Sequence, residues 1–313
     1  FMRKLEARDS EAMNRWAKVL KARMETGEPY LVNIDNCNAA LPEEQKKLGL
    51  EIKQSNLCSE ITLPTNEERT AVCCLSSVNL EHFDEWSKVD TFIPDLITML
   101  DNVLQNFMDS VKGKTGYNKA AYSAMRERSV GLGAMGFHSY LQKNNIAFES
   151  MYASSFNNKA FSYIKDRASA TTRKLAEERG EAPDMEGSGK RNAHLLAIAP
   201  NASSSIICGG TSPSIEPNRA NVYTHKTLTG SFKVKNKYLD DLLLELVPSK
   251  KKRDEIWKDI AAHEGSVQHL DILTDEQKEI FKTAPELNQI WIVEHASMRQ
   301  QYVCQSQSVN LFF

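Results

Sequence analysis

No Cys-x-x-Cys pair occurs in the sequence, and its six cysteines are scattered: Cys37, Cys58, Cys73, Cys74, Cys208 and Cys304. Neither a cysteine-based zinc cage nor a disulfide framework is therefore indicated, and a reducing cytosol is the expected compartment. The seven histidines contain no pair at the i, i+4 spacing of a zinc-binding helix. We accordingly predict no metal site in this chain.

A charge excess of one sign is also missing, because 39 basic and 41 acidic residues leave a formal net charge of -2. That balance gives no reason to expect nucleic acid or an anionic membrane as a partner. The longest apolar runs fall well short of a membrane span, and we recognise no signal peptide. These absences favour a cytoplasmic protein.

The 313 residues are enough for one large domain or two smaller ones. The chain opens at Phe1 directly into a helical pattern and ends on the apolar run 311–313, without a polar tail. We therefore expect a chain truncated at both ends, either a fragment or one piece of a split protein.

Hydrophobic periodicity predicts alternating strands and helices. Helices are expected over about 10–26, 92–111, 154–179, 239–246, 253–262, 275–282 and 287–303, and strands over 30–34, 54–64, 71–80 and 194–200. The basic cluster 250–253 is most simply a solvated helix start. Strands separated by helices predict α/β layers, an arrangement that includes α/β barrels.

The stretch 54–64 places an amide, a thiol and a carboxylate at alternate positions: Asn56, Cys58 and Glu60. In an extended strand these side chains would project from one face. A neighbouring carboxylate and burial both raise the pKa of a cysteine and keep it neutral. A neutral S–H suggests hydrogen-atom chemistry rather than thiolate attack. The alternative is a buried structural cysteine.

A second cysteine, Cys73, lies on the next predicted strand, where it could face the same cavity as Cys58 or be a core residue. The glycine-rich segment 128–136 leads into a helix, but it lacks the third glycine of a dinucleotide fingerprint. Close backbone packing is the expected purpose of these glycines.

A run of small residues, three of which carry hydroxyls, follows Pro200 and Asn201 between a predicted strand and a helix: Ala202, Ser203, Ser204 and Ser205. Serines at a helix start cap it, and its free N–H groups can bind an anion. Three consecutive hydroxyls exceed the need of one cap. Either a phosphate or diphosphate site at about 200–206 or an ordinary capped turn fits this pattern.

Several segments together carry a family resemblance. Segment 55–61 (SNLCSEI) resembles the active-site finger loop of the large, catalytic subunit of class I ribonucleoside-diphosphate reductases, and 71–76 (AVCCLS) resembles that family's strand with one of two reducing cysteines. The segments 128–136, 189–205, 214–217, 265–269 and 299–308 also match the family in order. The resemblance covers nearly the whole chain.

The resemblance implies the C-terminal portion of a ten-stranded α/β barrel, with all of residues 1–313 in that one domain. It also implies that Cys58 carries a transient thiyl radical and that Glu60 acts as general base. Asn56 would hydrogen-bond the substrate hydroxyls, and Cys73 would be one half of the reducing dithiol. Residues 202–205 would hold the diphosphate of a ribonucleoside diphosphate.

The same resemblance implies partners that this chain does not supply. The second reducing cysteine, the allosteric nucleotide sites and the missing upstream part of the large subunit would precede Phe1. No Tyr-Tyr pair occurs to relay a radical, and no C-terminal cysteine pair occurs to accept electrons. A separate, metal-containing small (beta) subunit would supply the radical, and thioredoxin or glutaredoxin would act as reductant. No cofactor would be bound by this chain itself, and the large subunit would be a homodimer.

Two alternatives remain open from the residues alone. A cobalamin-dependent ribonucleotide reductase would share the finger-loop cysteine without needing the tyrosine relay. A non-catalytic α/β module that binds a phosphosugar or nucleotide would contain the same serine loop, with Cys58 and Cys73 as structural residues.

Asn201 and Ala202 depart from the acidic or hydroxyl residues common at the start of the family's phosphate loop.

Overall fold

The computed structural model describes residues 1–227 and 230–312. The α-helices are α1 (Met2–Glu6), α2 (Ser10–Thr26), α3 (Ile34–Ala39), α4 (Glu43–Lys47), α5 (Phe83–Trp86), α6 (Phe92–Val111), α7 (Asn118–Glu127), α8 (Phe137–Lys143), α9 (Met151–Arg179), α10 (Ser204–Ile207), α11 (Lys237–Leu246), α12 (Lys250–Ala262), α13 (Asp275–Ile280) and α14 (Gln289–Gln300). The strands are β1 (Cys74–Asn79), β2 (Val130–Met135), β3 (Val222–Thr227) and β4 (Gly230–Lys235).

Four extended segments lie side by side and run parallel. β1 pairs with β2 from Cys74 opposite Val130 onward. A bridge from Leu132 to Leu196 adds segment 195–198, and a bridge from Ile198 to Gln307 adds segment 305–308. Helices occupy each connection, as parallel strands require. The predicted α/β architecture is confirmed, and the described residues form an open arc of strands rather than a closed barrel.

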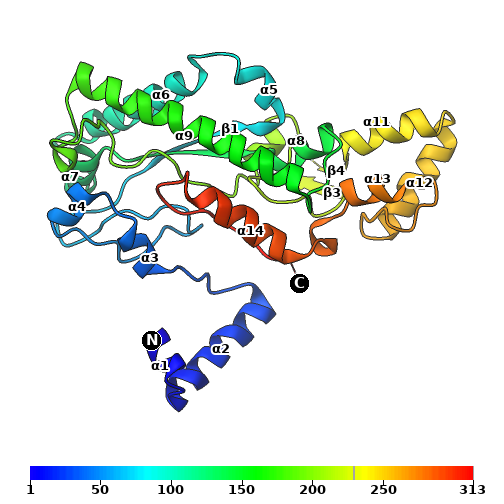
Figure 1. The fold of residues 1–313 in the computed structure, drawn as a ribbon, viewed down its shortest axis with the longest axis horizontal. Coiled ribbons are helices and arrows are strands. Elements are labelled where there is room, and N and C mark those ends of the chain that lie inside the picture. Colours follow the sequence, from blue (N-terminus) through cyan, green and yellow to red (C-terminus); the bar gives the residue numbers. More distant parts are fainter. Residues whose placement is uncertain (228–229, 313) are drawn as a thin grey trace.

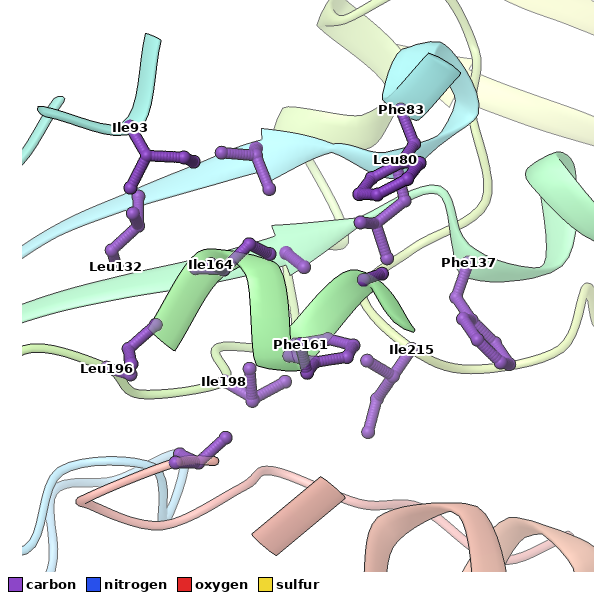
Figure 2. Packing of buried hydrophobic residues seen from close by; sticks show 14 of the residues in the cluster. Leu80, Phe83, Ile93, Leu132, Phe137, Phe161, Ile164, Leu196, Ile198 and Ile215 are labelled. Carbon is purple, nitrogen blue, oxygen red and sulfur yellow. The ribbon is translucent and has the colours of Figure 1, made fainter. Parts of the chain in front are cut away.

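Three long helices cover one face of this sheet (Figure 1): α6, α9 and α14. Their apolar side chains interlock with alternate residues of the strands to form the main core, of which Leu132, Phe161, Ile164, Leu196 and Ile198 are buried members (Figure 2). Among the described residues, no helix has both the length and the apolar character needed to cross a bilayer.

A second, smaller core lies at the far end of the molecule. There α11, α12 and α13 surround Leu239, Leu243, Trp257 and Ile260 beside the antiparallel hairpin of β3 and β4. The sequence analysis did not predict this hairpin, because β4 carries lysines and is mostly exposed along its length. At the other end of the chain, α1 and α2 project away from the sheet (Figure 1).

The periodic helices agree closely with the prediction. α2 and α6 span the predicted residues, while α9 begins at Met151, three residues before its predicted start at 154. Gly27 and Gly180 end α2 and α9 with positive φ angles of 77° and 84°, a conformation that glycine adopts without steric cost. The basic cluster begins α12, with Ser249 as its side-chain cap.

The predicted strand over 30–34 is wrong. Tyr30 and Leu31 are about half exposed, and the chain enters α3 at Ile34. An apolar run indicates a buried strand only where a neighbouring strand is available to pair with it. Here the described residues place no strand beside this segment.

The glycines of β2 are required by close packing, as predicted. A Cβ atom on Gly131 would lie 2.5 Å from Leu75 Cδ2 and 3.1 Å from Cys73 Sγ. One on Gly133 would lie 2.5 Å from the Ala197 carbonyl oxygen. These positions allow β1, β2 and segment 195–198 to approach one another on the face opposite the helices.

A buried ion-pair network joins α6 to the start of β2. Asp101 is fully buried, and its carboxylate accepts from Arg128 Nε at 2.8 Å and from Arg179 Nη1 at 3.0 Å. Burial alone would raise the pKa of the Asp101 carboxyl, but the Arg128 hydrogen bond and the charges of Arg128 and Arg191 hold that pKa below its ordinary value.

We expect Asp101→Ala to lower the free energy of unfolding by about 3–5 kcal/mol, because it leaves the buried Arg128 cation without its carboxylate. Urea titration followed by circular dichroism measures this loss. Asp90→Asn is the matched control, since Asp90 pairs with Arg167 on the surface and should cost less than about 1 kcal/mol. Equal losses in the two variants would contradict a structural role for the buried network.

Candidate active site

The segment 54–64 is an irregular loop, so the predicted extended strand is wrong. Ser59 has a positive φ of 68°, and its N–H donates to the Asn56 carbonyl at 3.1 Å to close a tight turn. The Asn56 side-chain oxygen accepts from the Ile61 N–H at 3.0 Å. The turn leaves Leu57 88% exposed while Ile61 is buried. Asn56, Cys58 and Glu60 therefore do not share one face in the manner of a strand.

Asn56 is exposed and shapes the loop through this contact. Cys58 lies beside a small cavity of about 150 Å³, whose walls include Ser59, Gln307, Ser308 and Asn310. Partial burial and the charge of Glu60 raise the pKa of the Cys58 thiol. The predicted neutral S–H at Cys58 is thus supported by this environment.

Glu60 is the most buried of the three predicted catalytic residues, at 2% exposure. Its backbone carbonyl accepts from the Ser306 N–H at 3.0 Å, which ties the loop to the last extended segment. Its side-chain Oε2 has no hydrogen-bond partner among the described residues. Because a buried carboxylate oxygen without a partner is costly, it is a candidate acceptor for a ligand hydroxyl.

Cys73 directly precedes β1 and Cys74 begins it, and the two side chains pack on opposite faces of the sheet. Cys74 packs against the main core under the helices. Cys73 packs instead with Ala71, Ile61, Leu63 and Ala197, on the face that the loop covers. Burial strongly raises the pKa of the Cys73 thiol. Cys73 is therefore the cysteine of the pair that shares a face with the Cys58 loop.

Gln305 connects this loop to Cys73. Its side-chain oxygen accepts from the Thr62 N–H at 3.3 Å, and its Nε2 lies 3.6 Å from Cys73 Sγ and 3.1 Å from the Val130 carbonyl oxygen. One buried amide therefore spans the loop, β2 and the thiol. The sequence analysis matched 305–308 to the family without predicting this role.

Glu127 is a buried carboxyl group near Cys73 that the sequence analysis missed. Burial raises its pKa to about 7, against the opposing hydrogen bonds from Ser123 and Ser129. Burial is the main reason that a thiolate is disfavoured at Cys73, and the neighbouring Cys74 and Glu127 groups disfavour it further. Its position directly before the glycine-rich segment was the available signal.

The loop 200–206 lies at the ends of β1 and β2. Asn201, with a φ of 50°, bonds through its side chain to Ser77 Oγ and to the Ala134 carbonyl oxygen. The expected serine cap is absent, because Ser203 makes no side-chain capping bond to the four-residue α10. Ser205 is buried, and its hydroxyl donates to the Ala202 carbonyl.

Ala202, Ser203 and Ser204 are exposed, so the two serine hydroxyls are accessible. A cavity of about 580 Å³ adjoins this loop and includes Ala202 and Ser205 in its walls. Cationic side chains also line it: Arg219, Lys235 and Lys237. Lys237 is paired with Glu81, so Arg219 and Lys235 give this cavity its positive charge, which suits an anionic group.

The model of the ribonucleotide reductase barrel domain matches residues 3–189 and 184–313. The chain belongs to the ribonucleotide reductase barrel-domain family. A ribonucleoside-diphosphate reductase large subunit of Invertebrate iridescent virus 3 is 50% identical over 303 residues, which cover 97% of this chain and 48% of the viral protein. The ribonucleoside-diphosphate reductase large chain of Encephalitozoon cuniculi is 31% identical. That match covers 96% of this chain and 42% of the Encephalitozoon protein.

A solved structure gives the same result for the ribonucleotide reductase fold. The class Id alpha subunit of Actinobacillus ureae superposes with a TM-score of 0.92 at 40% identity, covering 99% of this chain and 57% of that subunit. This ribonucleotide reductase chain thus spans about half the length of the relatives it matches. Their names do not favour a cobalamin-dependent reductase or a non-catalytic module.

Proposed function

We propose that this chain contributes the thiyl-radical site of a ribonucleoside-diphosphate reductase, which makes 2′-deoxyribonucleoside diphosphates. The observation that supports it most directly is the environment of Cys58: a thiol kept protonated beside Glu60, whose buried Oε2 has no partner among the described residues. A nucleophilic cysteine would need the opposite environment, with nearby positive charge.

In this proposal the Cys58 radical removes the 3′ hydrogen atom of the substrate, and Glu60 accepts the 3′-hydroxyl proton. The 2′-hydroxyl leaves as water with a proton from the reducing pair, which is Cys73 and a second cysteine in a part of the large subunit outside this chain. The two thiols supply two electrons and the hydrogen that replaces the hydroxyl, and they become a disulfide. The hydrogen atom then returns from Cys58 to the 3′ carbon, and the proton returns from Glu60 to the 3′ oxygen. The common face of Cys73 and the Cys58 loop supports this arrangement.

The proposal extends to partners of the whole enzyme. A metal-containing small subunit supplies the radical, the large subunit works as a homodimer, and thioredoxin or glutaredoxin reduces the disulfide. The test is an assay of the full large subunit that contains this chain, mixed with its small subunit and a thioredoxin system. Formation of deoxynucleoside diphosphate is expected, and its absence despite tight substrate binding would contradict the enzymatic proposal.

The phosphate loop allows a separate prediction. Ser204→Ala should weaken substrate binding about 10- to 150-fold with little change in the chemical step, because a hydroxyl bond to a charged phosphate contributes about 1.5–3 kcal/mol. Isothermal titration with a nucleoside diphosphate measures this change. Ser162→Ala on α9 is the control, since that hydroxyl donates only to the Lys159 carbonyl. Unchanged affinity in Ser204→Ala would remove Ser204 from the phosphate site.

A further inference from the structure

Two imidazoles and one carboxylate meet on the surface of the smaller core. The Asp259 carboxylate lies 3.3 Å from His263 Nδ1 through Oδ1 and 3.0 Å from His269 Nε2 through Oδ2. One ligand atom from each of the three residues lies within 4.8 Å of the others. We propose that Asp259, His263 and His269 bind a divalent transition-metal ion of the zinc class.

The backbone brings these residues together for identifiable reasons. Asp259 and His263 are four residues apart at the end of α12, so they share one helical face. Gly265 then reverses the chain with a φ of 88°, and its N–H donates to the Ile260 carbonyl at 2.8 Å. A Cβ at Gly265 would lie 2.5 Å from Ala220 Cβ, so the turn is packed tightly.

His269 is held in place by its neighbours. Val267 and Leu270 are buried in the smaller core, on either side of the half-buried Gln268 and the exposed His269. The rings of His263 and His269 stack with centroids 3.8 Å apart and an interplanar angle of 25°. The second imidazole therefore lies on an anchored loop, which reduces the entropy that an ion must overcome to order it.

The distances suit a four-coordinate ion. Nitrogen and oxygen ligands lie about 2.0–2.2 Å from zinc, which places neighbouring tetrahedral ligands about 3.3–3.6 Å apart. The contacts from Asp259 to His263 and His269, at 3.3 and 3.0 Å, are close to this range, and the three ligand atoms all lie within 4.8 Å of one another. His263 Nδ1 also lies 2.9 Å from the Asp259 backbone carbonyl oxygen. The ion would therefore replace that main-chain contact as well as the hydrogen bond between His269 and the Asp259 carboxylate.

The donor set also selects the class of ion. Two imidazoles with one carboxylate favour zinc, nickel or copper, whereas magnesium and calcium prefer oxygen ligands. Three protein ligands on an exposed surface leave at least one position for water. The search for histidine pairs in the sequence missed this group because the i, i+4 pair is formed by Asp259 and His263.

A bound ion would join the end of α12 to the loop 264–270. The Gly265 carbonyl in that loop accepts from the Asn221 N–H and side-chain Nδ2, at 3.2 and 3.1 Å. Asn221 directly precedes β3, and its carbonyl accepts from the Asn236 N–H after β4. The ion would thus stabilise the base of the hairpin as well as the helix.

Zinc titration of the purified protein tests the proposal, with His263→Ala, His269→Ala and Asp259→Asn as variants. We expect one equivalent of Zn²⁺ to bind to the wild type, with affinity lowered at least about tenfold in each variant. His82→Ala is the matched control, because His82 faces a single carboxylate, that of Glu85, at 3.2 Å without a second imidazole. It should leave zinc affinity unchanged.

Cobalt distinguishes this site from binding by the free cysteines. The wild-type Co²⁺ complex should show tetrahedral d–d absorption without thiolate charge-transfer bands, and the double variant His263→Ala/His269→Ala should lose that absorption. Zinc should also raise the melting temperature of the wild type but not of the double variant. The proposal is overturned if zinc binding in the variants equals that of the wild type, or if the cobalt spectrum is that of a thiolate complex.

Discussion

Replacing Cys58 with serine is expected to lower deoxynucleotide formation at least about 10³-fold, equivalent to roughly 4 kcal/mol in the barrier. Serine keeps the size of the side chain, but its O–H bond is too strong to give up a hydrogen atom as a thiol does. Substrate affinity should stay nearly constant, because the proposed phosphate contacts lie in the separate loop 202–205. Product analysis and substrate titration of the reconstituted enzyme measure the two effects.

Leu57→Ala is the matched control for this experiment. Leu57 occupies the same turn but is 88% exposed, so its truncation should leave turnover within about twofold of the wild type. Deoxynucleotide production by Cys58→Ser at a rate close to that of Leu57→Ala would rule out radical chemistry at Cys58.

The second large effect is expected at Cys73. Cys73→Ser should allow substrate binding and hydrogen abstraction but reduce steady-state turnover at least about 10²-fold. One thiol supplies only one of the two electrons that replacement of the 2′-hydroxyl by hydrogen requires, and no disulfide can form. Multiple-turnover assays with a thioredoxin system, together with a count of product per enzyme in a single turnover, separate these steps.

Cys74→Ser tests whether the face of the strand decides the role. The Cys74 side chain packs under the helices, so this variant should lose some stability and retain most of its turnover. Normal turnover by Cys73→Ser together with loss of turnover by Cys74→Ser would assign the redox role to Cys74 instead.

The helices could be predicted because their signals are local. The apolar stripe of α6 and the glycines after α2 and α9 act within a few residues. The parallel segments 74–79 and 195–198 were also recognisable as short apolar runs. By contrast, the turn at Ser59 contains no glycine to reveal its positive φ, so alternation of residue types indicated a strand that the chain does not form.

Local sequence patterns named the candidate site residues, but they could not give the contacts of those residues. The neutral thiol at Cys58 followed from the adjacent Glu60, which is a local feature. The link from Gln305 to Thr62 and Cys73 joins positions more than 200 residues apart, and no periodicity reports such a contact. Similarly, the Asn201 side chain hydrogen-bonds to the ends of two strands, which only the folded sheet brings together.

The order of the parallel segments in space is the order in which they are synthesised. Each segment pairs with the one that precedes it in the chain, in the order β1, β2, segment 195–198 and segment 305–308. During translation, each new strand therefore finds its template already present on the growing chain. Gln305 arrives with the final segment, so the amide that bridges Cys73 and the Cys58 loop is added only when the rest of this sheet has been made. A ribosome-stalled chain ending before residue 305 would hold both cysteines but not the Gln305 hydrogen bonds that tie the loop to Cys73.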